Sequence, residues 1–352
     1  MTCGLRQAGI EVIAGIDIDG RCRETYEHNN YPARFIEANV NFLPKDAFVK
    51  GIEVGEGKDK KKIKIKKNDD HLIFVGCSPC QFWSIINTDK TKSEESKNLL
   101  EDFRDFIDYY NPGYVVIENV PGIVSGANTP LTAFMEFLIH KGYFSIDKGV
   151  VKVHEHGVPQ TRKRFVLIAS RVKKVSLPVP VKDESLTVKN FIGEGAFEKI
   201  VAGHTDDSEL CHTSAGLSEK NLRRLAKTAH DGGTREGWKD DPELQLKVYK
   251  DNENVESFRF TDIYGRMFWA KPAPTITTRF YSLSNGRFGH PEQDRAISLR
   301  EGATLQTFPL DYVFKATTVT DISRIIGNAV PPALAKRIGE SIVESFKNNG
   351  KI

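Results

Sequence analysis

The chain has 352 residues, which is long enough for two domains because one domain usually takes about 100–200 residues. The composition, with 39% hydrophobic residues, 28% charged residues and five cysteines, excludes a disordered chain, a collagen-like repeat and a disulfide scaffold. The sequence contains neither a secretory signal nor an apolar run of the ~20 residues that span a bilayer. The net charge of +3 predicts no particular partner, so affinity for nucleic acid would require basic residues gathered on one face.

Short apolar segments alternate with amphipathic segments along the first half of the chain. The apolar segments predict strands at residues 12–16, 71–77, 114–120, 143–153 and 164–170. The amphipathic segments predict helices at residues 20–29, 93–110 and 130–140, the last of them stopped at Gly142. This alternation favours an α/β fold built on an open, mostly parallel sheet. The absence of a secretory signal favours a cytosolic protein with reduced thiols.

The alternation breaks down between residues 171 and 281, where prolines and glycines punctuate a polar stretch without a clear period. Helical patterning returns at residues 298–306 and 332–346. We therefore expect a first domain at 1–170, a separate irregular domain at 171–281, and a final segment at 282–352 that returns to the first domain.

A run of lysines at residues 58–67 (KDKKKIKIKK) is the densest charge cluster in the sequence. We interpret it as a solvated loop or hairpin between two α/β elements. Contact with a DNA backbone is the alternative, because lysines bind phosphate without a fixed geometry.

Residues that could carry chemistry follow the predicted strands. Cys77 and Cys80 come just after the strand at 71–77, and alone this pair could be half of a zinc site, a redox pair, or a loop with one nucleophilic cysteine. Glu118 ends the next strand, where a carboxyl group is costly to bury and is expected to face a ligand. A cysteine and a glutamate at neighbouring strand ends can attack one face of a ring and protonate its edge. Arg162 and Arg164 alternate onto one side of an extended segment, as phosphate or carboxylate binding requires.

Five ordered motifs resemble those of the DNA (cytosine-5) methyltransferase family, and the resemblance covers nearly the whole chain. They are SPCQ at 78–81, ENV at 118–120, QTRKR at 160–164, REGATLQTFP at 300–309 and GNAVPP at 327–332. The resemblance implies a Rossmann-like, S-adenosylmethionine-dependent sheet with a smaller target-recognition domain at 171–281. It also implies methyl transfer to C5 of a cytosine that is flipped out of double-stranded DNA.

The resemblance assigns roles to individual residues. Cys80 is the implied nucleophile that adds to C6, Glu118 is the acid that protonates N3, and Arg162 and Arg164 support the ring and its phosphate. For S-adenosylmethionine, Asp17 is matched to the ribose hydroxyls and Ile18 to the adenine, while Asn39 stands where the family usually has Asp. The further implied cofactor residues are Val40, Pro79, Leu100, Asn328 and Val330. No metal is implied.

The resemblance further implies a lid at residues 81–97 and contacts to DNA from a set of polar and basic residues. These residues are Gln81, Ser84, Arg223, Arg224, Arg235, Arg259 and Arg279, with Arg266 as a further candidate. The implied setting is a monomer in the bacterial cytosol, within a restriction-modification system whose endonuclease acts on the same site. The alternatives are a tRNA cytosine-5 methyltransferase, a silent DNA-binding module and a redox protein that uses both Cys77 and Cys80.

One departure concerns the start of the chain. The family's glycine-rich loop after the first strand is absent, and residues 1–9 look like the helix that follows it. We therefore expect a chain truncated within this cofactor motif, with a missing central strand that leaves two neighbouring strands with unpaired edges. As numbered, the chain is expected to bind the cofactor poorly.

Overall fold

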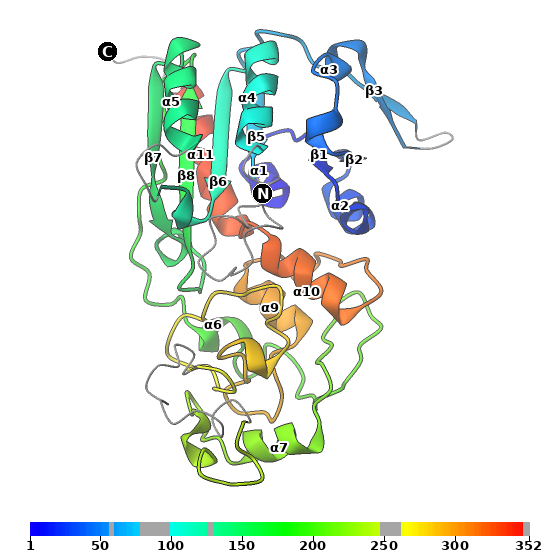
Figure 1. The fold of residues 1–352 in the computed structure, drawn as a ribbon, viewed down its shortest axis with the longest axis vertical. Helices are drawn as coiled ribbons and strands as arrows, with labels where there is room; N and C mark the ends of the chain where they lie inside the picture. The colour runs from blue at the N-terminus through cyan, green and yellow to red at the C-terminus, as the bar shows by residue number, and fades with distance from the viewer. Residues whose placement is uncertain (56–59, 78–98, 125–129, 247–261, 348–352) are drawn as a thin grey trace. The chain divides into compact units, whose positions relative to one another are not determined.

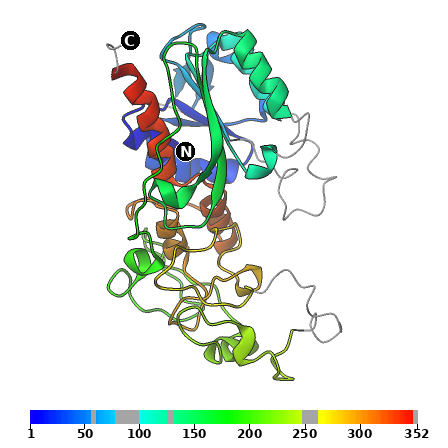
Figure 2. The same ribbon diagram turned by 90° about the vertical axis from the view of Figure 1, so that its left-hand side faces the viewer.

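The computed structural model describes residues 1–55, 60–77, 99–124, 130–246 and 262–347, drawn as coloured ribbon in Figures 1 and 2. The chain divides into two compact units. Unit 1 comprises residues 1–152, 163–180 and 332–352, and unit 2 comprises residues 153–162 and 181–331. Unit 2 thus differs from the expected domain at 171–281, because it leaves out residues 171–180 and also includes residues 153–162 and 282–331.

A four-stranded sheet forms the centre of unit 1, in the order β5-β6-β8-β7. Its strands are β5 (Ile73–Gly76), β6 (Tyr114–Asn119), β8 (Lys163–Ser170) and β7 (Ser145–Lys152). Strands β5 and β6 are parallel, whereas β6–β8 and β7–β8 are antiparallel. The expectation of a mostly parallel sheet is therefore wrong for these strands. Parallel neighbours need a crossover of a dozen or more residues, and only residues 153–162 separate β7 from β8.

A second, two-stranded parallel sheet joins β1 (Ala14–Asp17) to β2 (Arg34–Glu37). The 3-10 helix η1 (Gly20–Cys22) and helix α2 (Arg23–Asn30) connect the two strands. Within the described part of the chain, β1 pairs only with β2 and β5 pairs only with β6.

Helices cover the larger sheet and close the core of unit 1 (Figure 1). They are α4 (Leu99–Tyr110), α5 (Pro130–His140), α1 (Thr2–Gln7) and α11 (Pro332–Lys347). Ile107 of α4 and Leu138 of α5 pack with Ile117 of β6 in one buried apolar cluster. Helix α5 ends as expected, because Gly142 adopts a φ of +86° and its amide donates to the carbonyl of Ile139 at 3.0 Å.

Helix α11 packs on α1 and on the start of β6. The approach to α1 is so close that a Cβ atom at Gly4 would lie 2.2 Å from the carbonyl oxygen of Pro332. The Tyr114 hydroxyl lies 3.1 Å from the hydroxyl of Ser345, and the Phe346 ring centroid lies 5.1 Å from that of Tyr114. The first and last helices of the described chain therefore hold each other in place.

A small hairpin follows the two-stranded sheet. The 3-10 helix η2 (Val40–Phe42) and helix α3 (Ala47–Lys50) lead into strands β3 (Ile52–Val54) and β4 (Lys61–Ile63), which pair antiparallel. Residues 61–63 of the lysine run thus form the second strand of a hairpin, as one interpretation of the run expects.

Unit 2 has little regular structure around its core, as expected for much of this stretch. Its helices are α6 (Val188–Ile192), α7 (Glu219–Ala226), α9 (Leu299–Leu305) and α10 (Val319–Asn328), with short 3-10 turns η6 (Val153–His156), η7 (Arg235–Gly237) and η9 (Leu283–Asn285). Strand pairing within its described residues is limited to isolated bridges such as Gln160 with Ala273. In neither unit is a described helix both long and apolar enough to cross a membrane.

Candidate active site

A buried ion pair lies at the carboxyl end of β6. Glu118 is 7% exposed, and its Oε1 lies 2.8 Å from Nε of Arg164, which β8 contributes from the neighbouring strand. Burial lowers the pKa of the Arg164 guanidinium, and the adjacent Glu118 carboxylate opposes that shift. The pair therefore holds an oriented carboxyl group, which is suited to hydrogen bonding with a ring nitrogen, at the edge of the sheet where ligands bind in open α/β folds.

The first cysteine of the C-x-x-C pair lies at the same edge of the sheet. Strands β5 and β6 run parallel with Gly76 opposite Ile117, so Cys77 and Glu118 each come directly after this paired position. Four of the expected site residues, Pro79, Cys80, Gln81 and Ser84, and also the expected lid, fall in residues 78–98, outside the described part of the chain. Their roles therefore stay predictions.

Arg162 takes a different place from the expected one. It belongs to unit 2, is 3% exposed, and donates from Nη1 to the carbonyl of Ile276 and from Nη2 to the carbonyl of Gly327, both at 3.1 Å. Side-chain alternation places residues 162 and 164 on one side only if the segment between them is continuous and extended. The boundary between the two units falls between these residues. In this structure Arg162 therefore holds backbone in unit 2, and its expected catalytic role stays a prediction.

The residues expected to receive the cofactor gather at the carboxyl ends of β1 and β2. Asp17 is paired with Glu37 across these parallel strands, and its Oδ1 accepts the amide of Asp19 at 2.9 Å. Asn39 follows β2, and its Oδ1 accepts the amide of Asn41 at 3.0 Å, which caps η2. Ile18 is 67% exposed beside them. An exposed carboxylate next to an exposed apolar side chain fits a ribose joined to a flat base.

The other expected cofactor residues are less alike in their surroundings. Leu100 is buried in the core cluster of unit 1 together with Ile117. Asn328 is exposed at the end of α10, whereas Val330 is buried in unit 2, and Val40 is half-buried at the start of η2.

Two of the arginines expected to contact DNA are buried. Arg224 donates from Nε to the carbonyl of Leu244 at 2.7 Å, and its guanidinium carbon lies 5.2 Å from the ring centroid of Trp238. Arg266 is fully buried, and its guanidinium donates to four backbone carbonyls, those of Leu225, Thr228, His290 and Gln293. In this structure both side chains stabilise loops of unit 2, and their expected contact with DNA stays a prediction.

The remaining arginines of this set differ in exposure. Arg279 is exposed, Arg235 is half-buried, and Arg223 is exposed but pairs with Glu243 at 2.6 Å. Arg259 lies outside the described residues. Arg279 thus presents the guanidinium that is most accessible to a ligand in this group.

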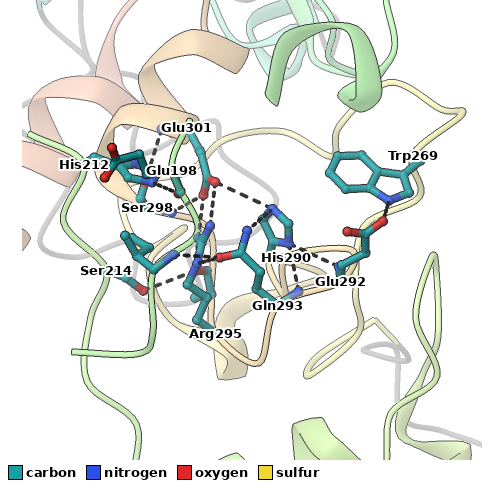
Figure 3. Close-up of polar contacts among 12 residues, drawn as sticks. Glu198, His212, Ser214, Trp269, His290, Glu292, Gln293, Arg295, Ser298 and Glu301 are labelled. Atoms are coloured by element: carbon teal, nitrogen blue, oxygen red, sulfur yellow. Dashed lines mark hydrogen bonds and ion pairs between the residues drawn. The ribbon is translucent and has the colours of Figure 1, made fainter. Parts of the chain in front are cut away.

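A buried polar network in unit 2, drawn in Figure 3, was not predicted from the sequence. Glu301 accepts hydrogen bonds at 2.6 and 2.7 Å from the guanidinium of Arg295, and both residues are buried. Ser298 and Glu301 form a reciprocal capping box at the start of α9, and the hydroxyl of Ser298 lies 2.9 Å from Nδ1 of His212. The order Ser-x-x-Glu before a helix is the signal that could have revealed this cap.

His290 joins the same network (Figure 3). Its Nδ1 accepts the amides of Glu292 and Gln293 at 3.1 and 3.0 Å, and its Nε2 lies 3.7 Å from Oε1 of Glu301. Burial lowers the pKa of His290 to about 4, although the Glu301 charge opposes that shift. The ring is therefore neutral at pH 7 and holds the loop before α9 by accepting hydrogen bonds.

Comparison with known proteins adds family information to this geometry. The sequence model of the family described as "C-5 cytosine-specific DNA methylase" matches residues 1–344. Because this match starts at residue 1, it does not support the expectation of a chain truncated within its first motif. Over 348 residues the chain is 38% identical to the type II methylase M.HgiDII of Herpetosiphon aurantiacus, covering 97% of this chain and 91% of that protein.

Solved structures show the same fold. A prophage-encoded protein of E. coli superposes with a TM-score of 0.69 at 20% identity, covering 99% of this chain and 96% of its own. The Dnmt2 of Spodoptera frugiperda superposes with a TM-score of 0.58 at 16% identity, covering 98% and 95%. These two likenesses establish the α/β fold.

Proposed function

Because this chain belongs to the C-5 cytosine-specific DNA methylase family and is a type II DNA (cytosine-5)-methyltransferase, we propose that Cys80, Glu118 and Arg164 carry its reaction. The observation that supports this proposal most directly is the buried Glu118–Arg164 pair at the end of β6, one strand away from the segment that leads to Cys80. A buried carboxyl group held at a strand end is costly unless a ligand or a partner uses it.

The reaction needs each of these side chains for a separate task. The thiolate of Cys80 forms a bond to C6 of the flipped cytosine, while the Glu118 carboxyl group donates a proton to N3 and so neutralises the negative charge that addition creates. C5 then becomes nucleophilic, and bound S-adenosylmethionine supplies the methyl group. When water accepts the C5 proton, the electron pair of the C5–H bond forms the C5–C6 double bond, the C6–sulfur bond breaks, Cys80 leaves as a thiolate and N3 returns its proton to Glu118.

Arg164 orients the carboxyl group for this exchange. Its Nε lies 2.8 Å from Oε1 of Glu118 and so fixes the direction of that carboxyl group. The guanidinium is charged at every working pH, so it also attracts the negative charge that develops on the substrate. We assign Arg164 to this role, while Arg162 is a proposed site residue that holds the backbone of Ile276 and Gly327.

For the cofactor, we propose that Asp17 accepts hydrogen bonds from the ribose hydroxyls and that Ile18 covers the adenine. Asn39 and Val40 lie beside them at the end of β2, and Pro79, Leu100, Asn328 and Val330 complete the proposed set. The exposed carboxylate and the exposed isoleucine at adjacent positions support this assignment.

For the substrate, we propose sequence-specific double-stranded DNA whose cytosine is flipped out of the helix. Arg223, Arg235, Arg259 and Arg279, with Gln81 and Ser84, are the proposed contacts. We further propose a monomer of the bacterial cytosol whose methylation blocks a cognate endonuclease at the same site without direct contact between the two enzymes, and a target-recognition role for unit 2.

A mechanism-based trap tests the central step. A target duplex carrying 5-fluorocytosine, incubated with the protein and S-adenosylmethionine, should form a denaturant-stable adduct, because fluorine at C5 prevents the elimination that releases the cysteine. Peptide mapping should locate the adduct at Cys80, and Cys80→Ser should abolish it. The matched control is Cys77→Ser, which should still form adduct and methylate. Loss of adduct in both variants would support the redox or zinc interpretation instead.

The role of Glu118 as the acid can be tested on an ordinary cytosine substrate. Glu118→Gln should lower kcat by about 10²–10⁴-fold, the usual contribution of a positioned proton donor. Wild-type turnover by the Glu118→Gln variant would exclude Glu118 as the acid.

A further inference from the structure

We propose that the lysine-rich face of the β3–β4 hairpin is a second DNA-binding surface, which contacts the phosphate backbone of duplex DNA without reading sequence. The surface consists of Lys62, Lys64 and Lys66. The choice of DNA as partner rests on the proposed function, while the binding surface itself rests on the observations below.

Residues 60–67, which include strand β4, carry the densest positive charge in the sequence. Residues 60–67 contain six lysines and no carboxylate, and taking these six from the 50 basic residues leaves 44 against 47 acidic ones. The rest of the chain is therefore slightly acidic. A polyanion approaching this protein meets its largest local excess of positive charge at the hairpin.

The local fold presents these lysines in a fixed row. Ile63 is buried in the cluster of unit 1 that contains Phe48, and the amide of Ile65 donates to the carbonyl of Phe48 at 3.1 Å. Because side chains alternate along an extended chain, Lys62, Lys64 and Lys66 all point away from that cluster, and all three are exposed. The isoleucines thus anchor the segment and the lysines line its outer face.

Within the described ranges the outer row forms no ion pair, although Lys62 lies opposite Glu53 across the hairpin and, after Lys60, contributes to the lowered pKa of that carboxylate. Of the six lysines, Lys60 pairs with Glu53 at 2.5 Å, whereas no ion pair within the described ranges involves Lys62, Lys64 or Lys66. Asp70, an acidic residue shortly after the run, already pairs with Arg171 at 2.7 Å. The charges of the row are therefore available to an external anion.

The spacing of the row suits a nucleic acid strand. Alternate residues of an extended chain are about 6.6 Å apart, since each residue rises ~3.3 Å. One strand of duplex DNA carries a phosphate every ~3.4 Å along its axis, and the strand winds around that axis, so neighbouring phosphates are farther apart and each step of the row corresponds to about one phosphate. Three lysines can therefore engage one strand simultaneously without bending it.

An exposed aromatic ring flanks the opposite face of the hairpin. Tyr31 is 64% exposed, and the cationic groups of Lys61 and Arg34 lie 5.6 and 5.8 Å from its ring centroid. Figure 1 shows β3 on the side of unit 1 that lies away from β7, with β5 and β6 between them. The basic surface is thus separate from the Glu118–Arg164 pair and extends the DNA contact of unit 1 beyond the target cytosine.

The test compares two triple variants that remove equal charge from unit 1. In the first, Lys62, Lys64 and Lys66 are each replaced by Gln. In the control, Gln replaces three lysines that already pair with carboxylates, Lys45, Lys50 and Lys141, whose Nζ atoms lie 2.7, 2.6 and 2.8 Å from Asp105, Asp46 and Asp108. Affinity for a duplex without the target sequence is measured by fluorescence anisotropy between 50 and 200 mM salt.

The first variant should bind at least about tenfold more weakly at 50 mM salt, and its plot of log K against log salt should be less steep by about 2–3, since each lost phosphate contact removes ~0.9. The control should keep the wild-type slope. On a short duplex with a saturated target, kcat should be unchanged in both variants, whereas kcat/KM on plasmid DNA should fall only in the first.

Three results would overturn the proposal: an unchanged slope in the first variant, an equal loss in the control, or a loss confined to single-stranded RNA of the same length. The failure of the proposed function would look different. In that case the wild-type protein would methylate no DNA at all, while the two triple variants could still be compared by their binding slopes.

Discussion

The two units satisfy their buried backbones in different ways. In unit 1, all six residues of β6 are buried, and their backbone groups bond to the ladders of β5 and β8. In unit 2, short helices are joined by long irregular segments, and buried guanidinium groups take the place of a ladder. Arg266 and Arg300 each bind four backbone carbonyls, while Arg162 binds two.

The lack of strand ladders in unit 2 explains why arginine side chains can be buried there. A guanidinium has five N–H donors in a fixed plane, so one side chain can satisfy several loop carbonyls that no neighbouring strand reaches. Burial without such partners would be prohibitive. Both units have buried apolar clusters, and unit 2 adds a few buried guanidinium groups that each hold several loop segments.

The largest expected effect is at Arg266. Arg266→Met should destabilise unit 2 by about 3–5 kcal/mol, because four buried carbonyls lose their donor and Asp294 loses its partner. Urea unfolding followed by the fluorescence of Trp238, which is buried in unit 2, measures this loss. The exposed Arg279→Met is the control and should change stability by less than ~0.5 kcal/mol. Equal effects of the two substitutions would refute the proposed contrast between buried and exposed arginines.

Arg162 and Arg164 sharpen the comparison, since they are two residues apart and belong to different units. Arg162→Met should cost about 2–4 kcal/mol of stability, because it leaves the carbonyls of Ile276 and Gly327 unpaired. Arg164→Met should instead lower kcat by about 10²–10³-fold, the usual effect of removing one electrostatic contact to a reacting group. Kinetics and urea unfolding of both variants separate these outcomes, and a reversed pattern would contradict the assignment.

The next effect is a dependence on pH that arises in unit 2. Since burial lowers the pKa of His290 from 6.5 to about 4, the unfolded chain binds this proton more readily than the folded one. The stabilising contribution is complete above pH 6.5, and up to about 3 kcal/mol of it is lost as the pH falls towards 4.

Substitution of His290 isolates this contribution. In His290→Asn, the side-chain oxygen can still accept the amides of Glu292 and Gln293, but nothing titrates. The unfolding free energy of this variant, measured between pH 4 and 7, should fall less steeply than that of the wild type by the amount given above. Parallel curves would show that another group is responsible.

The smallest expected effect is at the cap of α9. Ser298→Ala removes the acceptor for the amide of Glu301 and the partner of His212, so it should cost about 1–2 kcal/mol. Ser218→Ala on α7 is the matched control, because its hydroxyl caps an exposed turn at 3.3 Å, and it should cost about 0.5–1 kcal/mol. Thermal denaturation of both variants compares a buried cap with an exposed one.

Most of unit 1 could be predicted from the sequence because its signals are local. The apolar runs at 71–77 and 114–120 contain β5 and β6, and residues 130–140 form α5 with the stop at Gly142. The direction of β8 was not predictable from its apolar pattern, which is the same in parallel and antiparallel neighbours. It followed instead from the short connection after β7.

Unit 2 was less predictable because its signals are not local. No sequence pattern around Arg224 and Arg266 distinguishes an arginine buried beneath a loop from one that faces DNA. Their hydrogen-bond partners lie up to 41 residues away in the chain. The network around Glu301 is similar, except that its capping box could be found in the sequence. The ends of β1 and β2 were predicted as cofactor positions through the family resemblance, and the structure brings Asp17 and Asn39 to one edge of the sheet.

The packing of α11 on α1 has a consequence for biosynthesis. After β8 is complete, the ribosome still has to synthesise residues 181–331 before it reaches α11, the helix that packs on α1. At ordinary elongation rates this synthesis takes roughly 10–30 s. Throughout this interval the nascent unit 1 lacks helix α11. Modification of the genome by a newly made molecule therefore begins only after translation is almost finished, and chaperones have that interval in which to act.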